Sequence, residues 1–297
     1  MRASAPRRVL LALAADVLVL LVFLYVALGA GSSGEQPVLG EELPVAMDAQ
    51  LSAPQVPAAA PGPGTVKAGI EDMLTTSEVD AGVALMDSGG DLVLGSGEDQ
   101  PFVLASVAKV YILVAYLDQV SSEGRRLSDS DLSLLQPMIR YSDNDSASYL
   151  WDEIGGEAGI AAFLESKGLA AVRPTEEDAW GTLYASASQV AELLWRLAYA
   201  QLLDPESTQV ALSLLSDIDS EQAWGVSAGA GQRGDEVLLK NGWYPEVEGW
   251  RVNSAGAVMS TEGGYVLVIL THHSESLGEG IALVEDIAAR INAFMSN

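Results

Sequence analysis

The chain has 297 residues, of which 49% are hydrophobic, and its 41 Asp and Glu outnumber 15 Lys and Arg, giving a formal net charge of −26. This length and apolar content suit one large domain or two interleaved layers. The acidity argues against nucleic-acid binding, which needs basic patches, and indicates a solvated surface instead. The absence of cysteine excludes disulfides, thiol catalysis and cysteine-linked lipid. With only two histidines, His272 and His273, we expect no metal site and no cofactor.

The N-terminus predicts the compartment. Three arginines in residues 1–8 precede the apolar run Val9–Ala30, whose only charge is Asp16, and three glutamates follow it within a dozen residues. At 1.5 Å per residue the run spans about 33 Å, enough to cross a bilayer. The charges predict a cytoplasmic N-terminus, a single-pass transmembrane anchor and an exported body. The alternative is a cleaved signal peptide and a secreted protein, because small residues crowd 27–34.

Residues 31–64 are rich in Pro, Ala, Gly and Ser and predict an extended linker that holds the domain away from the membrane. The folded domain is expected over 65–297. Its apolar periodicity and Gly-containing turns predict helices and strands in this order: a helix at 66–75, a hairpin of strands 81–86 and 92–94, an extended entry and helix at 102–116, helices at 128–140, 147–154, 158–166, 186–200 and 207–215, strands from 236 to 273, and a helix at 281–294.

That order predicts an α+β fold. An antiparallel sheet would be flanked by the N- and C-terminal helices, and the helical block at about 106–215 would form an inserted all-α lobe. A cleft between two such lobes is a common place for a site. Ser106 falls where the first strands pass to the helical lobe, so we expect it at this cleft.

The stretch FVLASVAKVYILVAY, residues 102–116, brings Ser106 and Lys109 together at a helix start. Positions i and i+3 share one helix face, so hydroxyl and amine can meet. The positive end of the helix dipole lies beside the serine, and a partly desolvated lysine loses its proton more easily. The pair is therefore a candidate nucleophile and base. The alternative is a serine that only caps the helix.

Two later segments offer partners. Ser142, Asp143 and Asn144 form a polar turn between two helical segments, which can point a hydroxyl and a carboxamide into the cleft or can simply cap a helix. Lys240-Asn241-Gly242 ends the strand EVLLK, where a lysine offers charge and the glycine permits close backbone approach. An ordinary strand end followed by a turn is the alternative there.

Together, Ser-x-x-Lys, Ser-Asp-Asn and Lys-x-Gly in this order resemble the class A β-lactamases and the wider penicillin-recognising serine hydrolases. The resemblance runs from residue 65 to the C-terminus. It implies that Ser106 is the acylated nucleophile and that Lys109 helps to take its proton. It also implies that Ser142 relays a proton to the leaving nitrogen and ties Lys240 to the site.

The same resemblance assigns substrate binding. It implies that Asn144 hydrogen-bonds the substrate's side-chain amide and that Lys240 attracts its carboxylate. The backbone N–H groups of Ser106 and of Trp243, just after Gly242, would form the oxyanion hole. For Trp243, a place in a substrate platform and a purely packing role remain equal alternatives.

Two features depart from the family pattern. The third motif there is usually Lys-Thr-Gly or Lys-Ser-Gly, whereas Asn241 replaces the hydroxyl residue; its amide can still donate a hydrogen bond, so we place it among the substrate-binding residues. Class A enzymes also carry a loop glutamate that activates the deacylating water. Glu176, Glu177 and Asp178 lie nearby but none is in register, and we interpret them as solvated charges. Slow deacylation is therefore expected.

The leading functional prediction is an exported, membrane-tethered serine hydrolase of class A β-lactamase type, which forms an acyl-enzyme with β-lactams or related amides. A peptidoglycan D-Ala-D-Ala peptidase or esterase with the same chemistry is the first alternative. A non-catalytic cell-wall-binding relative is the second. We expect a small β-lactam or peptidoglycan-type substrate, a monomer, and no nucleic-acid partner.

Overall fold

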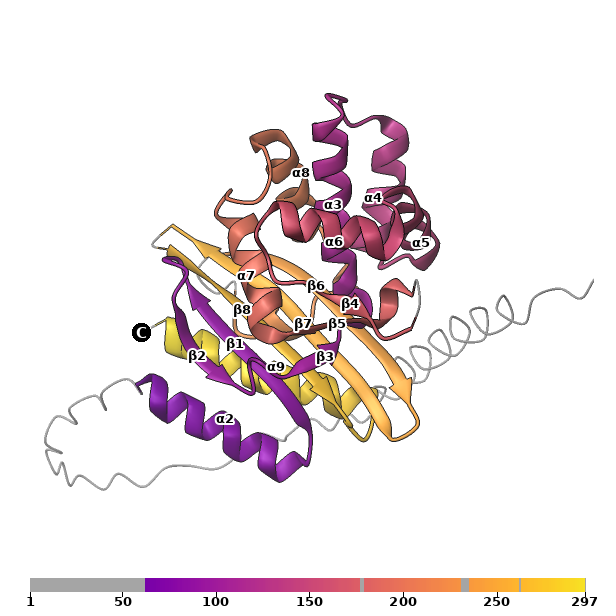
Figure 1. The fold of residues 1–297 in the computed structure, drawn as a ribbon. Coiled ribbons are helices and arrows are strands. Elements are labelled where there is room, and N and C mark those ends of the chain that lie inside the picture. The colour runs from indigo at the N-terminus through magenta and orange to yellow at the C-terminus, as the bar shows by residue number, and fades with distance from the viewer. Residues whose placement is uncertain (1–61, 177–178, 231–234, 262, 297) are drawn as a thin grey trace, which may run out of the picture. The chain divides into compact units, whose positions relative to one another are not determined.

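The computed structural model describes residues 62–176, 179–230, 235–261 and 263–296. Its main feature is a five-stranded antiparallel sheet with the strand order β2-β1-β8-β7-β6 (Figure 1). The strands are β1 (Asp80–Asp87), β2 (Leu92–Ser96), β6 (Glu236–Glu246), β7 (Gly249–Ser260) and β8 (Gly263–His272). The predicted α+β class with an antiparallel sheet is confirmed.

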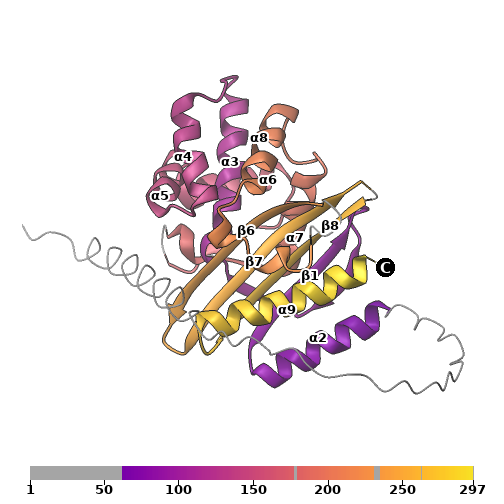
Figure 2. The same ribbon diagram turned by 180° about the vertical axis from the view of Figure 1, so that it is seen from behind.

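Both faces of this sheet are covered. The terminal helices α2 (Pro63–Ser77) and α9 (Leu277–Met295) lie over one face (Figure 2), and α7 (Ala187–Ala198) packs on the other. Along β8, Val266 and Val268 belong to the core on the α7 side, whereas Leu267 and Ile269 belong to the core under α2 and α9. Successive strand residues point to opposite faces, so two covered faces explain why β8 is apolar throughout.

The all-α lobe stands at one end of the sheet (Figure 1) and is built around α3 (Ala108–Ser122). Helix α3 contacts the other four helices of the lobe: α4 (Asp129–Arg140), α5 (Asn144–Glu153), α6 (Gly156–Ser166) and α8 (Pro205–Ser216). Eleven of its fifteen residues are buried. A helix surrounded in this way has to be apolar all round, which accounts for the run VYILVAY.

A second, small sheet was not predicted. It has the order β3-β5-β4, formed by β3 (Pro101–Val103), β5 (Leu183–Ser186) and β4 (Arg173–Pro174). Strands of two to four residues are too short to show a period of two in the sequence. The pairing matters for the site, because Phe102 of β3 pairs with Ala185 of β5 and so holds the chain just before Ser106.

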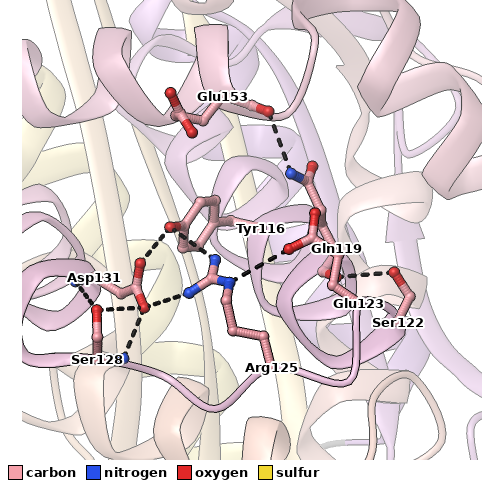
Figure 3. Close-up of polar contacts among 8 residues, drawn as sticks. All are labelled: Tyr116, Gln119, Ser122, Glu123, Arg125, Ser128, Asp131 and Glu153. Carbon is pink, nitrogen blue, oxygen red and sulfur yellow. Dashed lines mark hydrogen bonds and ion pairs between the residues drawn. The ribbon is translucent and has the colours of Figure 1, made fainter.

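A polar network fixes the corner between α3 and α4 (Figure 3). The Tyr116 hydroxyl donates to Asp131 Oδ1 at 2.6 Å, and Arg125 Nη1 donates to Asp131 Oδ2 at 2.7 Å. Ser128 caps α4 and forms a capping box with Asp131. A carboxylate with this many donors in the first turn of α4 ties that helix to α3, the helix that carries Lys109.

The predicted anchor at 9–30 and most of the predicted linker lie outside the described residues, as do Glu177 and Asp178. Helix α2 begins at Pro63, two residues before the predicted domain start. Within the described part of the chain, no helix has the length and apolarity needed to span a membrane. The membrane anchor and the domain limits therefore stay predictions.

Candidate active site

Ser106 lies on a 3-10 turn, η1 (Ala105–Val107), directly before α3. The residue ahead of it, Ala105, has φ +50°, a left-handed conformation that costs a non-glycine residue about 1–2 kcal/mol. The surrounding contacts hold this conformation in place. The buried Asn253 amide of β7 donates to the carbonyl oxygens of Val103 at 3.0 Å and Leu104 at 3.1 Å. The serine is thus presented by a segment that is fastened to the sheet.

Lys109 is fully buried one helical turn beyond Ser106. Its Nζ lies 3.2 Å from Ser106 Oγ, 3.0 Å from Ser142 Oγ and 2.8 Å from Asn144 Oδ1, and it also donates to the carbonyl oxygen of Ser142. The ring of Trp180 lies 4.9 Å from the same nitrogen. The amine thus joins the serine at the start of α3 to the turn between α4 and α5.

The turn that carries Ser142 has two roles. Asp143 caps α5, since its carboxylate accepts from the Ser146 N–H at 2.7 Å. Ser142 itself adopts φ +58°, and from this position its hydroxyl reaches both Lys109 and Lys240. The capping interpretation and the cleft interpretation of this turn are therefore compatible.

Lys240 lies within β6, the edge strand of the main sheet. The predicted strand end at Lys240-Asn241-Gly242 is wrong, because the chain pairs with β7 as far as Glu246. Lys240 is fully buried, and its Nζ donates to Ser142 Oγ at 3.1 Å and to the carbonyl oxygen of Asn241 at 3.0 Å. Burial lowers the pKa of Lys240 to about 7. The Ser142 hydroxyl therefore lies between two buried lysines, one of which titrates close to neutral pH.

Gly242 brings β6 against η1. A Cβ at this position would lie 2.7 Å from the Ser106 nitrogen and 2.8 Å from the Leu104 oxygen, so a larger residue would force the backbones apart. The glycine is required for close approach. It places the β6 backbone next to the N–H group of Ser106, which is the arrangement that an oxyanion hole needs.

The sequence model of the Beta-lactamase enzyme family matches residues 65–131 and 130–295. This chain belongs to the Beta-lactamase enzyme family. The match covers nearly all of the folded domain, including every segment that contributes to the lysine–serine cluster. The resemblance seen in the three motifs is thereby confirmed.

The chain is also similar to curated proteins and to solved structures. The protein named "Putative lipoprotein LppW" from Mycobacterium tuberculosis is 26% identical over 236 residues, covering 74% of this chain and 73% of that protein, and the protein of the same name from Mycobacterium bovis matches equally. Among solved structures, TLA-3 extended-spectrum β-lactamase has a TM-score of 0.71 at 16% identity, and PBP-A has 0.67 at 20%. Each comparison covers 80% of this chain and 100% of the other. At these identities the structural likeness shows the fold.

The β-lactamase-like fold gathers five of the predicted site residues into one cluster: Ser106, Lys109, Ser142, Asn144 and Lys240. Asn241 is placed differently. It follows Lys240 on a pleated strand, so its side chain points away from that of Lys240. Its amide donates to the carbonyl oxygens of Gln222 at 2.8 Å and Trp224 at 3.0 Å. Its predicted substrate contact, like the roles of the five clustered residues, stays a prediction.

The structure describes two further positions for which the sequence left alternatives, and their roles stay predictions. Trp243 is half-buried and packs edge-on against Trp224, with 5.7 Å between ring centroids. This is a packing contact, and it leaves part of the indole open to solvent. Glu176 is exposed, in keeping with a solvated loop charge.

Sequence reasoning missed Trp180 and Asn253 as parts of the site. Trp180 stacks over Lys109, and its Nε1 donates to Ser148 Oγ at 3.1 Å. An aromatic residue inside the acidic loop TEEDAWG was the available signal. For Asn253 the signal was an amide within the mainly apolar strand WRVNSAGAVM, because a buried polar group in such a position needs specific partners.

Proposed function

We propose that this family member is a serine hydrolase that forms an acyl-enzyme at Ser106 with β-lactams or related peptidoglycan amides. One observation carries the proposal. Ser106 Oγ, Lys109 Nζ, Ser142 Oγ and Lys240 Nζ form an unbroken series with successive separations of 3.2, 3.0 and 3.1 Å. Such a series can move a proton from a nucleophile to a leaving group without a large displacement of any side chain.

In the proposed step, Ser106 Oγ attacks the substrate carbonyl carbon while its proton passes to the neutral amine of Lys109. The C–N bond then breaks, Ser142 gives its proton to the leaving nitrogen, and Lys109 returns a proton to Ser142. The products are an ester on Ser106 and a neutral amine, with Lys109 restored. The neutral amine of Lys109 has two protons and one lone pair, so a hydroxyl among the oxygen atoms near its Nζ can donate to it.

Substrate contacts follow from the same geometry. Lys240 would attract a substrate carboxylate, and Asn144 would hydrogen-bond a side-chain amide. The N–H groups of Ser106 and Trp243 would stabilise the oxyanion, supported by the close approach at Gly242. Asn241 could join the carboxylate contact only if its amide left the carbonyl groups of Gln222 and Trp224.

We propose that deacylation is slow. The support comes from the sequence, where no loop carboxylate matches the register of the class A glutamate that activates water. The exposed Glu176 is consistent with this. An enzyme that acylates without rapid turnover would react with β-lactams as a penicillin-binding protein or a weak lactamase.

A peptidoglycan peptidase or esterase is the second candidate. It is favoured by the likeness to PBP-A, of which a variant was solved as an acyl-enzyme complex with penicillin G, with a TM-score of 0.65 and 22% identity to this chain. The third candidate, a non-catalytic cell-wall-binding protein, is opposed by the two fully buried lysines. Buried charges are costly to keep where no function uses them.

We also propose that the domain is exported and tethered to the membrane. The relatives are named lipoproteins, but this chain has no cysteine to carry a lipid. The anchor that we propose is instead the apolar run at 9–30, and a cleaved signal peptide is the alternative.

Intact-mass spectrometry after exposure to penicillin G tests the proposal. The wild type should gain the mass of one penicillin, Ser106→Ala should gain none, and Ser133→Ala, which changes an exposed serine of α4, should label like the wild type. An unlabelled wild type, or a labelled Ser106→Ala variant, contradicts the proposal. Two further assays then separate the first two candidates. Hydrolysis of a chromogenic cephalosporin would favour the β-lactamase-type hydrolase, and cleavage of a D-Ala-D-Ala peptide would favour the peptidase.

A further inference from the structure

The only two histidines of the chain lie together at the end of the main sheet. His272 ends β8 and His273 follows it. Adjacent residues of a regular strand point to opposite faces, but His273 has φ +69°, which turns its side chain out of that alternation. The two imidazole rings consequently stack, with centroids 3.6 Å apart and planes inclined by 34°. This backbone conformation is unfavourable for a non-glycine residue. It places the His273 ring on the same side of the chain as the His272 ring.

A carboxylate from a distant part of the chain meets these rings. Asp80 begins β1 and pairs in register with His272. Its Oδ2 lies 3.3 Å from His273 Nδ1. One ring nitrogen of each histidine and one carboxylate oxygen of Asp80 all lie within 4.8 Å of one another.

These separations suit a metal ion. Ligand atoms about 2.0–2.2 Å from Zn²⁺ lie roughly 3.3–3.6 Å from each other in a tetrahedron. The contact between His273 and Asp80 already has this length. The other ligand atoms lie within 4.8 Å of one another, and the Asp80 side chain is exposed.

Against the expectation from the small number of histidines, we propose that Asp80, His272 and His273 form a binding site for a divalent transition-metal ion, with Zn²⁺ as its typical occupant. Three protein ligands would leave one position for water. Imidazole nitrogens favour zinc, copper and nickel, whereas calcium and magnesium require mainly oxygen ligands. The strongly negative chain also concentrates cations near its surface.

A second carboxylate, that of Glu246, contacts one of the proposed ligands, His272. Glu246 Oε2 lies 2.6 Å from His272 Nε2, and Glu246 Oε1 accepts from Arg251 Nη2 at 2.5 Å. Carboxylates that hold a metal-binding histidine fix the orientation of its ring. Glu246 is therefore a positioning residue. Through it, an ion on β1 and β8 would also be coupled to the hairpin of β6 and β7.

The site is separate from the chemistry at Ser106, so it goes beyond the proposed function. An ion that binds only the folded chain stabilises it in proportion to the logarithm of its concentration. The expected consequence is a zinc-dependent rise in unfolding temperature. Loss of zinc binding would leave the acylation of Ser106 untouched.

The test uses the full-length chain in detergent, purified without a histidine tag and stripped of metal by a chelator. Calorimetric titration should give one Zn²⁺ per chain, and zinc should raise the unfolding temperature. Asp80→Asn and His273→Asn should each lower the affinity at least about tenfold, and Glu246→Gln by about tenfold. Asparagine at 273 tolerates the left-handed conformation. Glu248→Gln, an exposed neighbour, and Ser106→Ala should bind zinc like the wild type.

A second measurement keeps the proposal testable if a variant does not fold. The wild type has only two imidazoles, so stoichiometric Zn²⁺ should shift both of their proton resonances together. Absence of a one-to-one complex, histidine resonances that zinc leaves in place, or unchanged affinity in both Asp80→Asn and His273→Asn overturns the site. Failure of acylation in a chain that still binds zinc would contradict only the proposed function.

Discussion

Gly242 of β6 is in backbone contact with Ser106: a Cβ at Gly242 would lie 2.7 Å from the Ser106 nitrogen. This contact joins the edge strand of the sheet to the turn that starts the helical lobe. It also sets the distance between the nucleophile and the two N–H groups proposed for the oxyanion hole.

We therefore expect Gly242→Ala to fold but to acylate slowly. The added methyl group must displace β6 or η1, and a shift near 1 Å in a catalytic site can lower the rate by about 100-fold. The rate of penicillin adduct formation measures the effect. Gly278→Ala on α9, where an added Cβ meets no atom within 4 Å, is the matched control. Equal rates for both variants would show that the contact does not control the site.

At Ser142, the effect of the hydroxyl on acylation can be measured separately from the effect of the strained backbone on stability. Its φ of +58° suits glycine, so Ser142→Gly removes the hydroxyl without strain, whereas Ser142→Ala keeps the strain. Both variants should lose about 10²–10⁴ in the rate of acylation, because both lack the proposed proton relay. In urea, the free energy of unfolding should be about 1 kcal/mol higher for Ser142→Gly than for Ser142→Ala. A Ser142→Gly protein that acylates at the wild-type rate would exclude the relay.

Lys240 should give acylation a pH dependence centred near 7. Because burial lowers the pKa of Lys240 to about 7, its ammonium carries the charge below that pH and loses it above. For a β-lactam with a free carboxylate, the second-order rate of acylation should fall roughly tenfold between pH 6 and pH 8, following the protonated fraction. Lys240→Arg stays charged and should lack this step. A neutral ester substrate is the control, and a step of equal size with that substrate would assign the titration to another group.

Asp131 should contribute acid-sensitive stability to the helical lobe. Burial alone raises the pKa of this carboxyl, but hydrogen bonds from Tyr116, Ser128 and Arg125 outweigh burial and lower the pKa to about 2 (Figure 3). A folded-state pKa below the usual 3.8 stabilises the folded chain above pH 4, and this stability is lost as the pH falls from about 4 to about 2. The contribution should be about 1–2 kcal/mol, since water screens the exposed side of Arg125.

The comparison of wild type with Asp131→Asn isolates this group from the other carboxylates. Chemical unfolding at pH 6 should show the variant less stable by that amount, and the difference should shrink toward pH 2. A difference that stays constant over this range would mean that packing, and not the charge of Asp131, stabilises the corner.

Much of the fold could be predicted because it depends on local pattern. The period of the apolar residues identified α2, α9 and the lobe helices, and the turn DSGGD identified the first hairpin. The short β3, β4 and β5 could not be predicted, since each is selected by a partner strand far away in the chain. The role of Asn253 could not be predicted either, because its amide donates to the carbonyl oxygens of Val103 and Leu104, which lie about 150 residues earlier in the chain.

By itself, the sequence determined the order of the longer helices and strands and the three motifs that place this chain in its family, because each motif is a short run of residues whose spacing is local. Only the tertiary structure decided how the side chains meet. Strand alternation turns Asn241 toward Trp224 and Lys240 toward Ser142. Two imidazoles meet the carboxylate of Asp80, which lies 193 residues before His273 in the chain. The left-handed conformation of His273 and the register of β1 with β8 bring them together. Such contacts arise from backbone conformation and strand pairing, which no local pattern of residue types encodes.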